Sequence, residues 1–510
     1  MTSWLVSRIE GFARTQPAQR AVTEGDRVLD YASLWTQANA FAAALHEERF
    51  ALGDRVALIL QNSLEAVVAT YGTWIAGGVI VPLNAQAKAR DFGPWLRHAD
   101  ARVVVHEAGH GDAESAIDSL PETPLVIVTG AGSAAPGARR WSELLADVPQ
   151  HAAIDVDTNV LAMILYTSGT TGRPKGVMLS HANLAANVQS IVEYLGLVAT
   201  DSIVSVLPFY YSYGASVLHT HLAVGARIVI ESNLVFPHLM VETMARERVS
   251  GFSGVPSTFV LLLNRVPLDQ YDLSSLRYLT QAGGAMAPVT TTRLRSALPH
   301  ARLFVMYGQT EATARLAWLP PDRLEEKLGS VGVAIPGVEL EVRDENGRRA
   351  DAFAVGDVYA RGANVMLGYW NDAETTAGVL QDGWLKTGDM GHVDADGFLF
   401  LSGRRSDMIK TGAHRVHPKD VEEVIADLAG VGEVAVIGID DEVMGQVIKA
   451  FIVPQAGTDV STDTVKAHCR ERLAIYKIPK FIEFVADLPK TASGKIRRAV
   501  LAGSDLREVS

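Results

Sequence analysis

Helix-like segments alternate with short apolar runs over most of the chain, and this alternation limits the possible folds more than any other feature. Seven apolar runs predict buried strands: residues 55–60, 79–83, 102–106, 125–128, 202–208, 227–230 and 302–308. Amphipathic or apolar stretches long enough for helices lie between many of them, such as SLEAVVATYGTWIA. Because strands that alternate with helices favour parallel sheets with covering helices, we predict an α/β fold.

Two changes of pattern divide the rest of the chain. From about residue 330 the segments become short and turn-rich, which predicts a β-rich lobe. After the charged segment GRRSDMIK (403–410), helix and strand patterns alternate again over roughly the length of a small domain. We therefore predict a large N-terminal domain over residues 1–402 and a small, mobile α+β C-terminal domain over 403–510.

The composition argues against a nucleic-acid partner, an intrachain disulfide and a membrane span. The net charge is −12 and no long basic run is present, so duplex nucleic acid is not an expected partner. The only cysteine, Cys469, allows no disulfide within the chain, which suits a cytoplasmic protein. Residues 66–87 carry no charge, but Gly77, Gly78 and Pro82 interrupt them, so a helix and a buried strand explain this window better than a membrane span.

The segment YTSGTTGRPKG, residues 166–176, has the composition of an anion-binding loop. Its glycines let backbone N–H groups approach a ligand, its hydroxyl groups add donors, and Lys175 supplies a positive charge. It is not a Walker A loop, because GxxxxGK[ST] is absent. An apolar run precedes it and Ser180 then caps a predicted helix, so a phosphate site is favoured over a plain surface loop.

Five further segments are ambiguous when taken singly. YGQTE combines an aromatic ring with a hydroxyl and a carboxylate that suit a base, a phosphate and Mg²⁺, but a turn with a solvated glutamate has the same composition. The glycine pair, the acidic turn, the arginine pair and the basic tail likewise fit either a nucleotide site or ordinary loops and surface charge. They are QAGGAMA (281–287), WLKTGD (384–389), SGRRSDMIK (402–410) and KTASGKIRR (490–498).

In this order and spacing, the six motifs resemble those of the adenylate-forming superfamily, which includes acyl-CoA synthetases, peptide-synthetase adenylation domains and luciferases. The resemblance runs from about residue 10 to residue 500, and YTSGTTGRPKG is its most specific part. It implies that a carboxylate attacks the α-phosphorus of ATP, giving acyl-AMP and pyrophosphate, and that a thiol then displaces AMP. Cations must offset the repulsion between the two anions that meet.

The resemblance also implies residue roles. Thr310 would contact the α-phosphate, Glu311 would hold Mg²⁺, and Lys495 would bridge the carboxylate and the α-phosphate. Tyr307 would stack on adenine, and Arg415 would approach a phosphate. The remaining nucleotide contacts would be Thr167, Ser168, Gly169, Thr170, Thr171, Gly172 and Lys175 at the β,γ-phosphates, Gly283, Gly284, Ala285 and Gly308 at the base, and Asp389 and Arg404 at the ribose.

In this superfamily the small domain rotates between the two half-reactions. Lys495 would serve the first and then move away to open a path for the thiol. The hinge would lie at Ser406, where many relatives have aspartate or lysine.

The acid side departs from the usual pattern. In PFYYSYG (208–214), Tyr211 stands where many relatives have histidine and would gate the acyl site without titrating near neutral pH. Tyr213 and Gly214 would form the wall beside it. No aspartate is placed to bind an α-amino group, which leaves fatty, branched or aryl acids. Arg315 could pair with a second carboxylate, although a structural role is the simpler interpretation.

The favoured function is an AMP-forming acyl-CoA synthetase that uses ATP, Mg²⁺ and CoA. An acyl-AMP ligase that loads a carrier protein shares every motif. A non-catalytic scaffold is disfavoured, because Lys175, Glu311, Asp389, Arg404 and Lys495 are all present. The identity of the acid and the choice between monomer and homodimer stay open.

Overall fold

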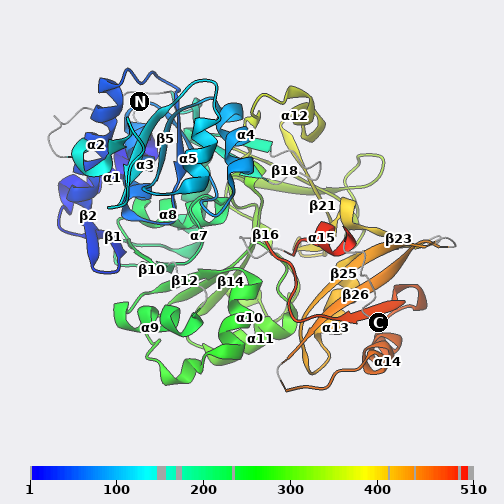
Figure 1. Ribbon diagram of the computed structural model, residues 1–510. Coiled ribbons are helices and arrows are strands. Elements are labelled where there is room, and N and C mark those ends of the chain that lie inside the picture. Colours follow the sequence, from blue (N-terminus) through cyan, green and yellow to red (C-terminus); the bar gives the residue numbers. More distant parts are fainter. Residues whose placement is uncertain are drawn as a thin grey trace.

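A computed structural model describes residues 3–145, 157–167, 175–231, 236–411, 414–441, 444–455, 457–491 and 496–503. Within these residues the chain forms four β-sheets and the helices that cover them (Figure 1). Two large sheets and their helices make up the N-terminal part. A smaller sheet forms the β-rich lobe, and the fourth belongs to a separate C-terminal unit, drawn in orange and red in Figure 1.

The first large sheet is parallel at its centre and antiparallel at its edges. Its strand order is β16-β15-β14-β13-β12-β10-β11-β1-β2. The parallel strands are β1 (Arg20–Glu24), β10 (Ser202–Ser205), β11 (Arg227–Ile230), β12 (Gly251–Gly254), β13 (Tyr278–Gln281) and β14 (Arg302–Tyr307). The antiparallel strands are β2 (Arg27–Asp30), β15 (Ala317–Leu319) and β16 (Val333–Ala334). Short connections cannot supply a parallel crossover, which explains the antiparallel pairing of β2 and β15 with the strands before them.

The second large sheet has the order β19-β9-β8-β4-β3-β5-β6-β7. Its strands are β3 (Arg55–Ile59), β4 (Val79–Pro82), β5 (Ala101–Glu107), β6 (Leu125–Thr129), β7 (Arg139–Arg140), β8 (Leu161–Thr167), β9 (Lys175–Ser180) and β19 (Gly368–Tyr369). Strands β8 and β9 are antiparallel, and Thr167 pairs with Lys175 where the hairpin leaves the described residues. The glycine-rich segment therefore extends from the end of this hairpin.

Helices separate and cover the two sheets. Helix α8 (Ser212–Ala223) is buried at every position from Tyr213 to Ala223, as expected for a helix with protein on all sides. One hydrophobic core joins α8 to both sheets, through Leu58 of β3 and Val204 of β10 among others. The other helices of this part are α1 (Trp4–Thr15), α2 (Tyr31–Glu47), α3 (Leu64–Ile75), α4 (Ala89–Ala99), α5 (Gly111–Asp118), α6 (Trp141–Leu144), α7 (His181–Leu195), α9 (Pro237–Glu247), α10 (Pro256–Arg265), α11 (Pro288–Ala297) and α12 (Ala373–Val379).

The β-rich lobe shares that core, whereas the C-terminal unit has its own. The lobe contains β17 (Val338–Arg343), β18 (Gly356–Gly362), β20 (Leu380–Gln381), β21 (Trp384–Val393) and β22 (Leu399–Arg404). The C-terminal unit contains β23 (Ile409–Thr411), β24 (His414–Val416), β25 (Val431–Asp441), β26 (Gly445–Pro454), β27 (Phe481–Phe484), α13 (Pro418–Ala426), α14 (Thr462–Arg472) and α15 (Arg498–Gly503). Its core includes Ile409, Val436, Ile452 and Cys469.

The predicted α/β class, with a large N-terminal part and a small C-terminal part, is confirmed. The division at residue 402 stays a prediction. Gly403 and Arg404 still pair with β21, and Ser406 lies in the short 3-10 turn Arg405–Asp407 that follows. Residues 64–75 form α3 and residues 79–82 form β4, and none of the described helices is long and apolar enough to cross a membrane.

Candidate active site

The predicted adenine-binding segments lie side by side at the carboxyl ends of two parallel strands. Gly283, Gly284 and Ala285 follow β13, and Tyr307 ends β14 beside it. Ligands of open α/β sheets bind at this end of the strands. The Gln281 amide donates to the Gly284 carbonyl over 2.8 Å and holds the first loop, where Gly283 has a φ of +86°.

Gly308 turns the chain back directly after Tyr307. A Cβ built at Gly308 would lie 2.0 Å from the carbonyl oxygen of Ala314, so only glycine fits this close approach. The turn places Thr310 and Glu311 at the strand ends, in the 3-10 segment Thr310–Ala312. Gln309 has a buried amide nitrogen, Nε2, without a hydrogen-bond partner in the described part of the chain. An unused buried donor here suits a ligand that offers an acceptor.

Tyr307, Asp389 and Arg404 form one connected cluster. The Tyr307 hydroxyl donates to Asp389 Oδ2 over 2.6 Å, and Arg404 Nε lies 3.3 Å from Asp389 Oδ1. Asp389 and Arg404 are direct neighbours across the β21–β22 pair. Burial and the Asp389 charge raise the pKa of Tyr307 well above its usual value, and Asp389 raises the pKa of Arg404. The cluster therefore holds a neutral phenol, a carboxylate and a half-exposed guanidinium.

A second cluster joins Lys175 and Glu311 through a residue that the sequence did not single out. The hydroxyl of Tyr369 donates to Glu311 Oε1 over 2.9 Å, and Lys175 Nζ lies 5.1 Å from the centre of the Tyr369 ring. Tyr369 is in β19, which pairs with β9 and so stands beside Lys175. Burial and the charge of Glu311 raise the pKa of Tyr369, which keeps its hydroxyl a donor. The only sequence signal was an aromatic pair in GYW (368–370).

Tyr166, at the start of the glycine-rich segment, is anchored by a histidine that the sequence also missed. The Tyr166 hydroxyl lies 2.8 Å from His98 Nδ1, and Trp370 Nε1 donates to the His98 carbonyl over 2.9 Å. Trp95 stacks on Tyr166 with the ring centres 6.0 Å apart. Nothing in the local sequence of α4 marks His98, because its role depends on contacts far along the chain.

The predicted acyl wall lies next to Thr310. Thr310 Oγ1 donates to Ser212 Oγ over 3.3 Å, at the first residue of α8. Tyr211 is the half-buried cap residue before that helix, and burial raises its pKa. Tyr213 is buried, and its hydroxyl donates to the Thr280 carbonyl over 2.9 Å. A Cβ on Gly214 would come within 2.1 Å of the Pro208 carbonyl oxygen, so glycine is required there.

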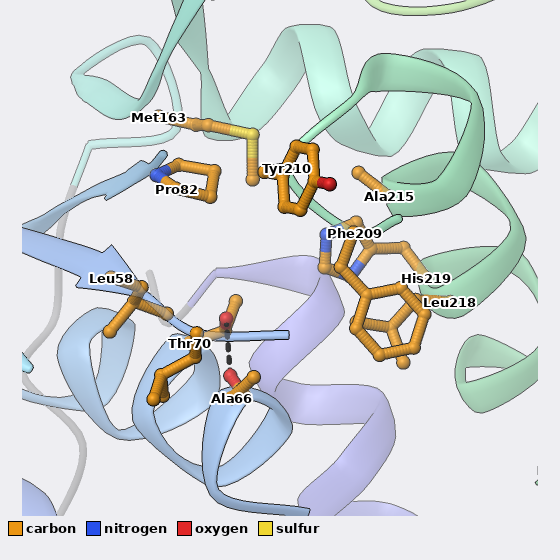
Figure 2. A pocket seen from close by; sticks show the side chains of 11 residues that line it. Leu58, Ala66, Thr70, Pro82, Met163, Phe209, Tyr210, Ala215, Leu218 and His219 are labelled. Atoms are coloured by element: carbon orange, nitrogen blue, oxygen red, sulfur yellow. Dashed lines mark hydrogen bonds between the residues drawn. The ribbon is translucent and has the colours of Figure 1, made fainter. Parts of the chain in front are cut away.

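Small cavities flank α8 on two of its faces. One of about 20 Å³ lies between α8, α3 and the strands β3 and β4; Figure 2 shows Pro82, Met163 and Tyr210 on its wall. The other, of about 10 Å³, lies between α8 and β12, β13 and β14. The neighbouring imidazoles are neutral, since burial lowers the pKa of His219 to about 3 and that of His221 to about 4.

Several predicted site residues cannot be placed. Ser168, Gly169, Thr170, Thr171, Gly172 and Lys495 lie outside the described residues. Only the backbone is described for Ser406 and for Arg415, which lies in β24. No group of three or more metal-binding side chains occurs among the residues that are described.

Comparison with known proteins shows the family of the chain. The model of the AMP-binding enzyme family matches residues 9–370, and that of the AMP-binding enzyme C-terminal domain matches residues 420–495. The chain belongs to the AMP-binding enzyme family.

Its full-length relatives are CoA ligases. The chain is 33% identical to a methyl-dioxo-octahydroindenyl-propanoyl:CoA ligase of Rhodococcus jostii, with 97% of each chain covered. It is 32% identical to the indoleacetate–CoA ligase of Aromatoleum aromaticum, with 96% of each covered.

Solved structures agree. The anthranilate CoA ligase AuaEII in complex with anthranoyl-AMP matches with a TM-score of 0.90 and 28% identity, covering 98% of this chain and 96% of that one. ATP-bound MatB from Rhodopseudomonas palustris matches with a TM-score of 0.90 and 30% identity, with 98% of each chain covered. The chain is thus an AMP-forming acid–thiol ligase whose substrates are a carboxylic acid, ATP and CoA.

Proposed function

We propose that this acyl-CoA ligase activates a compact carboxylic acid at the junction of Thr310 and Ser212, with the nucleotide held by the two clusters described above. The observation that carries the proposal is the convergence of Asp389, Arg404 and Glu311 on the strand ends beside α8. In this arrangement the ribose hydroxyls bind between Asp389 and Arg404. Tyr307 faces the base, next to the loop that contains Gly283, Gly284 and Ala285.

The triphosphate lies along Lys175 and the glycine-rich segment. Lys175 is the first residue of β9, so its charge stands at the mouth of the hairpin from which that segment extends. Thr310 donates to the α-phosphate from the same turn that contains Glu311. The phosphoryl transfer needs positioning and charge neutralisation rather than a protein nucleophile, and this donor set contributes the positioning and part of the charge.

Glu311 is the residue that would hold Mg²⁺. A single carboxylate agrees with the way Mg²⁺ binds at nucleotide sites, where phosphates and water supply the other ligands. When bound, Mg²⁺ supplies positive charge that offsets the repulsion between carboxylate and triphosphate. Tyr369 orients the Glu311 carboxylate by donating to Oε1.

The acid lies along α8, with its carboxylate toward Thr310. The aromatic wall of Tyr211 and Tyr213 and the small volume of both cavities favour short or ring-bearing acids over long alkyl chains. A cavity of about 10 Å³ holds about one water molecule, so any acid that enters it moves the side chains around α8, and a long chain moves more of them than a compact acid does.

Three family roles remain proposals from the sequence. Lys495 stabilises the first transition state, Arg415 approaches a phosphate, and the small domain turns about Ser406 before CoA attacks. A cytoplasmic location and the choice between monomer and homodimer also stay expectations.

The test is pyrophosphate release from ATP and Mg²⁺ across straight-chain, branched and aryl acids of increasing size, with and without CoA. The proposal expects fast turnover only with CoA, and higher kcat/KM for compact acids than for long-chain acids. A maximum at long alkyl chains would contradict the proposed acid class. A single burst that CoA does not extend would contradict CoA as the acceptor.

A further inference from the structure

The cavity between α8 and the first sheet contains a buried arginine that has no acidic partner among the described residues. Arg315 is only 3% exposed. Its Nη1 donates to the Ala314 carbonyl over 3.2 Å, and its Nε reaches the Met306 sulfur at 3.4 Å. Its Cζ lies 4.1 Å from the centre of the Tyr213 ring, and it also faces Tyr194. A guanidinium has five N–H donors, and those of Arg315 reach a carbonyl, a sulfur and the Tyr194 hydroxyl, but no carboxylate among the described residues balances its charge.

Arg277, which directly precedes β13 of the same sheet, is a more exposed arginine, with 37% of its side chain accessible, that does have an acidic partner. It also stacks on a tyrosine, with Cζ 4.9 Å from the Tyr278 ring centre. Unlike Arg315, it pairs with the buried carboxylate of Asp201 through two contacts of 2.7 and 3.2 Å. Because a buried charge without a counter-charge is costly, the contrast indicates that Arg315 lacks one partner.

The groups around the cavity show what that partner must be. Ser216 Oγ donates to the Tyr213 carbonyl and Thr220 Oγ1 to the Ser216 carbonyl, each over 2.7 Å. The Tyr278 hydroxyl lies 2.5 Å from His221 Nε2; since His221 Nδ1 faces the Val217 carbonyl, Nε2 is the acceptor. These hydroxyl hydrogens are therefore already directed at protein acceptors. The missing group must accept hydrogen bonds and carry negative charge.

The position of the cavity connects it with the acid. It is lined by Ser253, Thr280 and Met306, from the carboxyl-terminal halves of β12, β13 and β14. The residues that follow β13 and β14 form the predicted nucleotide loops. Arg315 lies against the ring of Tyr213, and the adjacent Ser212 contacts Thr310, so Arg315 and the Thr310 contact lie on either side of the same residue of α8.

We propose that Arg315 binds a second carboxylate at the far end of the substrate, and that the preferred acids are compact dicarboxylic acids. This inference rests on the proposed function, because it places the acid along α8. A carboxylate matches the planar guanidinium with two parallel hydrogen bonds and supplies the absent negative charge. The second carboxylate takes no part in the chemistry: the first attacks ATP and forms the thioester.

The experiment compares linear dicarboxylates from succinate to sebacate with the monocarboxylate of the same chain length. The readout is kcat/KM for CoA thioester formation in wild type, Arg315→Met, Arg315→Lys and Arg277→Met. Wild type should prefer the best dicarboxylate by about tenfold or more, the gain expected for a charged hydrogen-bonded pair. Arg315→Met should abolish or invert the preference for the dicarboxylate. Arg315→Lys should retain part of the preference, and Arg277→Met should keep it.

Two outcomes overturn the inference. In the first, the wild type prefers the monocarboxylate at every chain length. In the second, Arg315→Met lowers kcat/KM for the dicarboxylate and for the monocarboxylate by the same factor. If Arg315→Met does not fold, the comparison of dicarboxylate with monocarboxylate in the wild type still tests the inference. A second readout, the thermal shift produced by each acid with AMP and without CoA, separates the two proposals. If wild type turns over no acid, the proposed function fails, whereas the shift by dicarboxylate against monocarboxylate still tests Arg315.

Discussion

The proposed nucleotide half and the proposed acyl half of the site differ in how completely their charges are balanced. In the nucleotide half, Asp389 pairs with Arg404 and receives the Tyr307 hydroxyl, while Tyr369 links Glu311 to Lys175. In the proposed acyl half, the buried helix α8 carries two neutral histidines, His219 and His221, and Arg315 stands without a carboxylate among the described residues.

This difference follows from what each half must recognise. ATP is the same in every turnover, so a fixed set of donors and acceptors can be arranged in advance. An acid is selected by differences in binding, and an unpaired polar group in the pocket rejects acids that leave it unpaired. The nucleotide half should therefore affect all acids alike, and the acyl half should change their ranking.

The largest expected effect comes from the nucleotide half. Glu311→Gln removes the carboxylate proposed to hold Mg²⁺ and should lower pyrophosphate release by about a hundredfold to a thousandfold for every acid. Stopped-flow or coupled pyrophosphate assays measure this. The control is Glu325→Gln. Glu325 is an exposed carboxylate that pairs with Arg295 over 2.7 Å, so its replacement should leave pyrophosphate release unchanged. A loss below about tenfold would show that Glu311 is not the metal-binding carboxylate.

Asp389→Asn should act mainly on ATP. It removes a charged acceptor that Tyr307 and Arg404 share, so the KM for ATP should rise by about tenfold to a hundredfold while the KM for the acid changes little. The matched control is Asp357→Asn in the same lobe, where the carboxylate pairs with Arg405 over 2.8 Å. That variant should lose stability and keep its KM for ATP. A larger rise in the KM for the acid would place Asp389 in the acyl half instead.

Tyr369→Phe should cause a smaller loss. It deletes the hydroxyl that donates to Glu311 but keeps the ring beneath Lys175, so pyrophosphate release should fall by about fivefold. Tyr369→Ala removes both contacts and should lower pyrophosphate release further. Mg²⁺ titrations of both variants should show a raised half-saturation concentration. Equal activity of Tyr369→Phe and wild type would mean that the hydroxyl does not orient Glu311.

The smallest effect on catalysis, but a clear one on stability, concerns two neutral histidines in α8 and one at the start of α7. Burial lowers the pKa of His181 and His221 to about 4 and that of His219 to about 3. Because the unfolded chain protonates them near pH 6.5, their contribution is complete above that pH. It falls by about 1.4 kcal/mol per pH unit for each as the pH drops toward 4.

Urea unfolding between pH 7 and pH 5 measures this dependence. His219→Gln keeps an acceptor for the Tyr71 hydroxyl, which lies 3.1 Å from His219 Nδ1, and cannot take up a proton. It should lower the free energy of unfolding at pH 7 and reduce its dependence on pH. An unchanged pH dependence would show that His219 is protonated in the folded protein, or is not buried in solution.

The same contrast explains what the sequence could predict. Residues of the proposed nucleotide half lie in short contiguous motifs, so the sequence could propose Tyr307, Thr310, Glu311 and Asp389 by resemblance, and their roles stay predictions. Tyr369 and His98 act through contacts with distant segments, and only the folded chain brings Tyr369 to Glu311. The strand and helix pattern predicted the α/β class, because buried strands and helices differ in length and period.

The acyl half was the least predictable. The sequence suggested a second carboxylate for Arg315 only as a remote option, since a lone arginine in a strand connection has no distinguishing pattern. Its burial, the stacking on Tyr213 and the absence of an acidic partner in the described part of the chain emerge only from packing. The antiparallel edges of the first sheet were missed for a related reason: short turns, not strand composition, decide strand direction.

The most direct test of the account measures the ratio of kcat/KM for the best dicarboxylate to that for its matched monocarboxylate in three proteins: wild type, Asp389→Asn and Arg315→Met. If one half serves every acid and the other selects among them, Asp389→Asn lowers both rates and keeps the wild-type ratio, whereas Arg315→Met removes the preference. A ratio that changes as much in Asp389→Asn as in Arg315→Met would contradict this division of the site.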